Sequence, residues 1–97
     1  LSGSGPAYIF EFTAGLIESG IKLGLSQDEA ELLAKETVYG AACLMNQSLD
    51  KPDELRNQVT SPGGTTEAAL GVFKKEGLRT IICEALTAAN NRSIELR

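Results

Sequence analysis

The sequence predicts an all-α fold, and three observations support this prediction. Apolar residues recur three or four positions apart over long stretches, which is the spacing of one face of an α-helix. No stretch alternates apolar and polar residues as a half-buried strand does. Turn and capping signals divide the chain into about five segments, so we expect a bundle of about five helices.

The first helix is expected over about residues 6–22. Ser4 is a candidate N-cap, with Pro6 in the first turn. Gly24 is placed to end the helix in a left-handed conformation. The apolar positions of this pattern include Ile9, Phe12, Leu16, Ile17 and Leu23.

The second helix has a marked start. Ser26 and Glu29 have the spacing of a capping box, in which each side chain bonds the backbone N–H of the other. The apolar pattern continues to about Leu49. A short third helix follows, with Asp50 as its cap and Pro52 in its first turn, and ends near residue 59.

Two further helices complete the chain. One runs from the segment 61–64 to Lys75 and is stopped by Gly77. The last covers about residues 78–95 and carries apolar residues on one face.

The composition is that of one ordinary globular domain. The chain has 97 residues, of which 42% are hydrophobic and 23% charged. No apolar run approaches the roughly 20 residues that span a bilayer, and the net charge of −4 argues against a nucleic-acid surface. We therefore expect neither a membrane nor a nucleic acid as partner. Because Leu1 leads directly into a helix-start signal, we interpret the chain as part of a longer protein.

The residue types that most often carry acid–base or metal chemistry are scarce. The sequence has no His, the commonest general acid or base and a frequent zinc ligand. Cys43 and Cys83 fall in apolar helical patterns, and we expect both to be small buried hydrophobes in a reducing compartment. The sequence therefore predicts no metal site.

Small residues recur inside the first two predicted helices, among them Gly15, Gly20 and Gly40. Gly costs about 1 kcal/mol relative to Ala in a helix interior, and close approach of another backbone would offset this cost. That backbone belongs either to the same chain or to a second copy in an interdigitated dimer, and composition does not decide between them.

The segment VTSPGGTTEAAL, residues 59–70, is the candidate functional loop. If Ser61 is the N-cap and Pro62 the first helical residue, the amides of Gly63, Gly64 and Thr65 have no intrahelical acceptor. Such a helix start is suited to a carboxylate or phosphate. Glu67 opposes an anion there unless its side chain points outward. The plain alternative is a capped turn between two helices.

Four segments resemble pyrroline-5-carboxylate reductase in order and spacing. They are ELRNQVTSPGGTTEAAL, LSGSGPAYIFEF, GAACLMNQS and EALTAANNRSIEL. The first resembles the family signature, and the second resembles the start of the family's second domain. The resemblance covers essentially the whole chain.

The resemblance implies more than composition does. It implies that residues 1–97 are the C-terminal helical dimerisation and substrate-binding domain, similar to the C-terminal domain of 6-phosphogluconate dehydrogenase, and that the N-terminal Rossmann domain is absent from this chain. It implies an oxidoreductase of the cytoplasm that reduces 1-pyrroline-5-carboxylate to L-proline in proline biosynthesis. NADPH or NADH is then bound mainly by the absent domain, and this chain alone is inactive. An intertwined homodimer is expected, and a decamer of dimers is the larger assembly that the resemblance allows.

The resemblance also assigns the site residues. The substrate carboxylate is expected on the amides of Gly64, Thr65 and Thr66, near the Ser61 hydroxyl. Thr66 is the candidate catalytic residue, with its hydroxyl facing the ring nitrogen. The expected substrate-binding residues are Val59, Ser61, Gly63, Gly64, Thr65 and Thr66. Two other hypotheses stay open at this point: a non-enzymatic helical interaction module, and a different dehydrogenase with a related helical domain.

Overall fold

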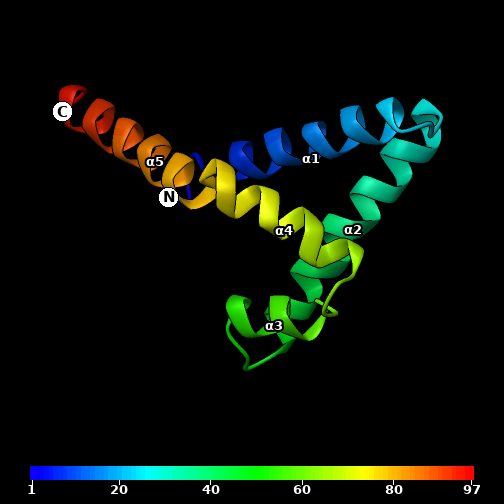
Figure 1. Cartoon of the computed structure of the whole chain (residues 1–97). Coiled ribbons are helices and arrows are strands. Elements are labelled where there is room, and N and C mark those ends of the chain that lie inside the picture. Colours follow the sequence, from blue (N-terminus) through cyan, green and yellow to red (C-terminus); the bar gives the residue numbers. More distant parts are fainter. The chain divides into compact units, whose positions relative to one another are not determined.

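The computed structural model describes residues 1–97, and its secondary structure is entirely helical (Figure 1). The helices are α1 (Gly5–Lys22), α2 (Gln27–Gln47), α3 (Pro52–Gln58), α4 (Thr65–Glu76) and α5 (Leu78–Glu95). The prediction of an all-α fold with about five helices is confirmed. The chain divides into two compact units, Leu1–Pro52 and Asp53–Arg97, each described here by itself. None of the helices has the length and apolar character needed to cross a membrane.

The first unit consists of α1 and α2. Gly24, between them, has a φ of 113°, so it provides the positive φ expected at this turn. The capping box is present: Glu29 N–H donates to Ser26 Oγ at 3.1 Å, and Ser26 N–H donates to Glu29 Oε1 at 3.0 Å. The pKa of the Glu29 carboxyl is lowered, first by the hydrogen bond from the Ser26 backbone N–H and second by interaction with the Ser26 side chain. α2 therefore begins where the sequence predicts, although it ends at Gln47, before Leu49.

α1 and α2 lie close together at Gly20. A Cβ on Gly20 would lie 3.4 Å from the Cβ of Ala30 and 3.3 Å from Cδ1 of Leu25. Ala30 and Ala34, both on α2, are the two buried residues of the chain. The small residue at position 20 is thus explained by close approach within one chain. Gly15 and Gly40 are not, because a Cβ at either position would meet nothing within 4 Å.

The start of α1 differs in detail from the prediction. Ser4 occupies the N-cap position, but its side chain makes no capping hydrogen bond. Its hydroxyl instead pairs with the Tyr8 hydroxyl at 2.9 Å. Ser4 has a helical φ and ψ of −98° and −16°, whereas a capping serine takes an extended conformation like that of Ser26.

The second unit consists of most of α3 with α4 and α5. Gly77 alone separates α4 from α5, and its φ of 75° and ψ of 47° are left-handed. It therefore ends α4 as predicted and also occupies the N-cap position of α5. Leu55, Leu70 and Leu78 are half-buried in this unit.

Candidate functional site

The segment between α3 and α4 forms a hydrogen-bonded turn. Gly64 N–H donates to the Ser61 carbonyl at 3.0 Å. Pro62 and Gly63 are the two central residues, and Gly63 has a φ of 73°. Proline at the second position and a positive φ at the third are the features of a type II β-turn. The Pro-Gly-Gly sequence therefore forms a β-turn that precedes the helix.

This turn changes the expected helix start. The N-cap of α4 is Gly64, with an extended φ and ψ of −87° and −177°, so the expectation that Ser61 is the N-cap is wrong. Pro62 lies in the turn and not in the helix. The reason is that the Ser61 carbonyl accepts the turn hydrogen bond from Gly64, which places the helix start three residues later. A Cβ on Gly64 would lie 3.2 Å from that carbonyl oxygen, so glycine fits this position best.

The Glu67 carboxylate returns to the turn. Gly63 N–H donates to Glu67 Oε1 at 3.1 Å. Glu67 is the third residue of α4, and its side chain reaches back as the acidic member of a capping box does, but to the residue before the N-cap. The carboxylate thus points toward the loop, and it occupies the Gly63 N–H.

Three backbone donors stay open at the start of α4. Thr65, Thr66 and Glu67 are its first three residues, so their N–H groups have no intrahelical acceptor. None of the three donates to any other acceptor in the chain, whereas the Gly63 and Gly64 N–H groups are both engaged. The helix dipole adds partial positive charge at this point. The open donors suited to an anion are therefore the backbone N–H groups of this first turn, among them those of Thr65 and Thr66.

The Thr66 hydroxyl also has no partner within the chain, unlike several threonines elsewhere. Thr13, Thr37, Thr60 and Thr87 each donate their hydroxyl to the carbonyl four residues earlier, at 2.6–2.8 Å. Residue 62, four positions before Thr66, lies outside α4, so the helix offers Thr66 no such carbonyl. A half-buried hydroxyl beside open N–H groups can therefore hydrogen-bond a bound molecule.

The other predicted site residues surround these donors in sequence. Val59 is 65% exposed, and Ser61, Gly63 and Thr65 are exposed as well. The loop of residues 59–64 and the first turn of α4 thus form one accessible segment. The loop therefore offers backbone and hydroxyl donors to a bound molecule.

An ion pair links α3 and α5 in the same unit. Arg79 Nη2 donates to Asp53 Oδ1, and Arg56 Nη1 contacts the same oxygen at 3.3 Å. The hydrogen bond and charge of Arg79, with a smaller effect of Arg56, lower the pKa of Asp53. The sequence marks Asp53 only as an acidic residue in a helix start. Its partner 26 positions away depends on how the helices meet.

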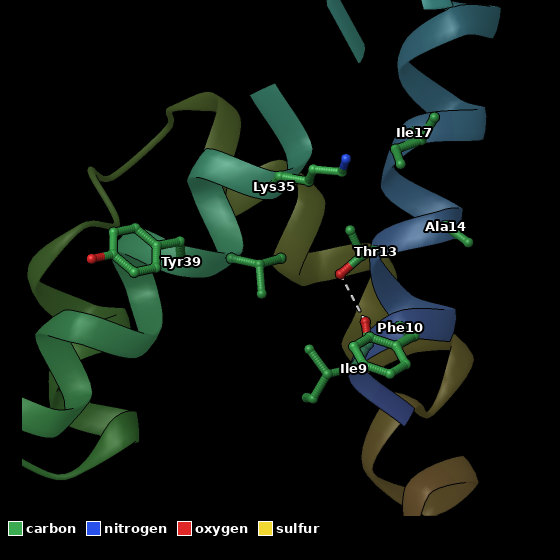
Figure 2. Close-up of a pocket in the computed structure, with 8 residues that line it drawn as sticks. Ile9, Phe10, Thr13, Ala14, Ile17, Lys35 and Tyr39 are labelled. Atoms are coloured by element: carbon green, nitrogen blue, oxygen red, sulfur yellow. Dashed lines mark hydrogen bonds between the residues drawn. The ribbon is translucent and has the colours of Figure 1, made fainter. Parts of the chain in front are cut away.

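The first unit carries an apolar groove of about 410 Å³ between α1 and α2 (Figure 2). It is lined mainly by Ile9, Phe10, Ile17, Val38 and Tyr39. Phe10 and Tyr39 are each 70% exposed. Lys35 extends from α2 toward α1 at the edge of the groove (Figure 2). Apolar surface of this kind marks an interaction face.

The remaining reactive side chains form no cluster. Cys43 is half-buried and Cys83 is exposed, and both are free thiols. The expectation that both are buried is wrong within this chain, because so little of the chain is buried at all. No group of three or more Cys, Asp or Glu side chains is placed to hold a metal ion.

The fold and the loop define a class of protein, an all-helical domain with two features. Apolar helix faces are exposed, as in domains that associate with other chains, and one polar loop has open backbone donors. Residues 1–96 match the family model described as pyrroline-5-carboxylate reductase dimerisation. The chain belongs to this family, as its sequence motifs predicted.

Known proteins named pyrroline-5-carboxylate reductase are similar to this chain over almost its whole length. A pyrroline-5-carboxylate reductase of Pseudomonas aeruginosa is 47% identical over 96 residues, and one of Pisum sativum is 46% identical over 96 residues. Each match covers 99% of this chain and 35% of the relative. The chain therefore spans about a third of the length of these relatives.

Solved structures of similar proteins have the same fold. The pyrroline-5-carboxylate reductase of Coxiella burnetii is 50% identical and superposes with a TM-score of 0.95 over 99% of this chain and 36% of its own. The pyrroline carboxylate reductase of Plasmodium falciparum, solved with NADP bound, is 33% identical with a TM-score of 0.91 over 95% of this chain and 35% of its own. The helical architecture is therefore that of this family.

Proposed function

We propose that the full-length protein reduces the C=N bond of 1-pyrroline-5-carboxylate to give L-proline, with NADPH or NADH as hydride donor. In this proposal, residues 1–97 supply the dimer interface and the site of the substrate carboxylate. One observation carries the proposal: in a chain of the reductase dimerisation family, open N–H groups adjoin a hydroxyl without a partner.

The carboxylate is proposed to bind at the start of α4. Thr65 and Thr66 N–H groups donate to its oxygens, and the helix dipole favours its negative charge. The Ser61 hydroxyl and the Cβ-free backbone of Gly63 and Gly64 border this position, and Val59 lines the ring. Binding the carboxylate fixes the position of the ring, which lowers the entropic part of the barrier.

Thr66 is proposed as the residue that contacts the reacting nitrogen. Reduction adds a hydride to the carbon of the C=N bond and a proton to its nitrogen. When bound, the dinucleotide supplies the hydride. The Thr66 hydroxyl accepts a hydrogen bond from the protonated imine nitrogen, or donates one to the amine nitrogen of the product. This role orients the ring and needs no ionisation of the hydroxyl.

The dinucleotide is proposed to bind mainly outside these 97 residues. This chain holds no strand and no glycine-rich loop that follows a strand, which is the motif that holds a dinucleotide in a Rossmann fold. The residues present therefore do not fit a complete cofactor site. We expect the 97-residue chain to be inactive by itself.

The proposed partner is a second copy of this chain. Its support is the exposure of large apolar side chains on α1 and α2, where only Ala30 and Ala34 are buried. Intrachain packing explains Gly20, while the surroundings of Gly15 and Gly40 are open and leave room for helices of another copy. A decamer of such dimers is part of the same proposal, and Ile81 and Ile82 on α5, 56% and 49% exposed, offer surface for it.

A cytoplasmic location also belongs to the proposal. Both cysteines are free thiols, which agrees with a reducing compartment.

The activity is tested with the full-length protein. Purified enzyme is mixed with NADPH or NADH, and dinucleotide oxidation is followed with three ring imines: 1-pyrroline-5-carboxylate, 1-pyrroline without the carboxylate, and the six-membered imino acid. We expect rapid oxidation with the first and weak oxidation with the second, because the loop then has no anion to bind. Equal rates with and without the carboxylate would contradict the proposed role of α4.

A further inference from the structure

We propose that Glu67 is a positioning residue of the substrate site, which acts by holding the Gly63 peptide group. This inference rests on the proposed function for its substrate. Glu67 does not contact the substrate in this arrangement. Its carboxylate is used within the loop, where Oε1 accepts the Gly63 N–H at 3.1 Å.

The bond acts on the one peptide group that distinguishes two kinds of turn. Type I and type II turns share their end-to-end hydrogen bond, here Gly64 N–H to the Ser61 carbonyl. They differ by a rotation of the central peptide, which here joins Pro62 to Gly63. The Gly63 N–H belongs to that peptide. A carboxylate that accepts it from the α4 side therefore selects the type II form.

Other contacts do not fix this peptide. Gly63 is exposed, and a Cβ built on it would meet nothing within 4 Å, so the space on its Cβ side is open. Glycine adopts positive and negative φ with similar ease. Without the Glu67 bond, the peptide is free to rotate, and the entrance to α4 becomes a mixture of conformations.

The same bond keeps Glu67 away from the donors that the substrate needs. As the third residue of α4, Glu67 lies within the positive end of the helix dipole, where a carboxylate is stabilised. By binding Gly63 it leaves the Thr65 and Thr66 N–H groups open. Glu67 thus prepares the loop before the substrate arrives, which lowers the cost of ordering it on binding.

Three variants of the full-length enzyme test the proposal: Glu67→Ala, Glu67→Gln and Glu76→Ala. Glutamine keeps an oxygen acceptor and loses the charge. Glu76, the last residue of the same helix, is the matched control for loss of one carboxylate. The readouts are kcat, the KM for 1-pyrroline-5-carboxylate, the KM for the dinucleotide, and amide hydrogen exchange of the peptide that contains residues 59–70.

We expect Glu67→Ala to raise the KM for 1-pyrroline-5-carboxylate about tenfold, the size of effect that one charge-assisted hydrogen bond produces. The KM for the dinucleotide should stay unchanged, and exchange should become faster only in the peptide of residues 59–70. Glu67→Gln should restore the substrate KM to near the wild-type value. Glu76→Ala should behave as wild type throughout.

Two results would overturn the positioning role: a wild-type substrate KM in Glu67→Ala, or a Glu67→Gln variant as impaired as Glu67→Ala. A wild-type enzyme that does not reduce the imine would overturn the proposed function and the substrate part of this inference. Faster exchange at residues 59–70 in Glu67→Ala would still support the hold on Gly63, so the two failures are distinguishable.

Discussion

Asp53 and Arg79 form an ion pair across 26 positions of sequence, joining the first turn of α3 to the first turn of α5. Arg79 lowers the pKa of the Asp53 carboxyl by hydrogen bond and charge. A carboxyl whose pKa is lower in the folded state contributes stability above its unfolded pKa and loses it as the pH falls through the folded pKa. The ion pair is exposed, so its contribution is small.

Arg79→Ala should therefore raise the pKa of Asp53 toward its usual value, though not fully, because Arg56 stays at 3.3 Å. The pH dependence of unfolding in the acidic range should become flatter. The pKa is measured by NMR titration of the Asp53 carboxyl, and stability by chemical unfolding at a series of pH values. Arg97→Ala, which removes an arginine outside this ion pair, is the control. An unchanged Asp53 pKa in Arg79→Ala would contradict the assignment.

Thr66→Ala in the full-length enzyme should lower kcat roughly a hundredfold, the effect of removing one preorganised hydrogen-bond partner of the reacting group. The oligomeric state should not change, because the hydroxyl has no partner within the chain. Thr66→Ser should recover most of the activity. Thr65→Ala, which leaves the backbone N–H in place, is the matched control and should stay active. Wild-type turnover in Thr66→Ala would remove this residue from the mechanism.

Gly77→Ala should destabilise the protein by about 1–2 kcal/mol, because an L-residue with a side chain disfavours the left-handed conformation. Gly77 has a φ of 75°. Gly71→Ala, in the interior of α4 with open space around its Cβ position, should stabilise the helix by about 1 kcal/mol. Thermal unfolding of the two variants should thus shift in opposite directions. Equal shifts would show that the turn between α4 and α5 is not left-handed in solution.

Phe10→Glu should weaken self-association, because it places a charge in the apolar groove between α1 and α2. Phe10 lines that groove and is 70% exposed in the single chain. Sedimentation of the full-length protein at micromolar concentration should show a dimer or a larger assembly of dimers for wild type, and a larger monomer fraction for the variant. Asn90→Glu adds the same charge at an exposed polar position of α5 and should leave association unchanged. A wild-type monomer would argue against the assembly itself.

Local signals in the sequence predicted most of the helix boundaries. The capping box of Ser26 and Glu29 was predicted fully, because both partners lie within one turn of helix and their geometry follows from the backbone. The role of Gly77 was predictable for the same reason. The start of α4 was not, because Pro62 fits the first turn of a helix and the second position of a β-turn equally well.

The features that the sequence did not predict depend on contacts between residues far apart in the chain or on the direction of a side chain, and residue spacing does not indicate either. The pairing of Asp53 with Arg79 requires α3 and α5 to meet, and neither residue carries a local signal for the other. The bond from the Gly63 N–H to the Glu67 carboxylate was not predicted, because the sequence left open only whether Glu67 opposes an anion or points outward. Cys83 is exposed although it lies in an apolar helical pattern, because apolar positions of this chain form exposed helix faces as well as an interior.

The burial of only Ala30 and Ala34 has a consequence for how this chain folds. A chain that gains so little apolar burial alone should obtain most of its stability from the second copy, so that folding and association form one coupled equilibrium. Its unfolding midpoint should then rise with protein concentration, which is not the case for a self-sufficient monomeric domain. The free energy of unfolding of each subunit then depends on the protein concentration, and it falls as the solution is diluted.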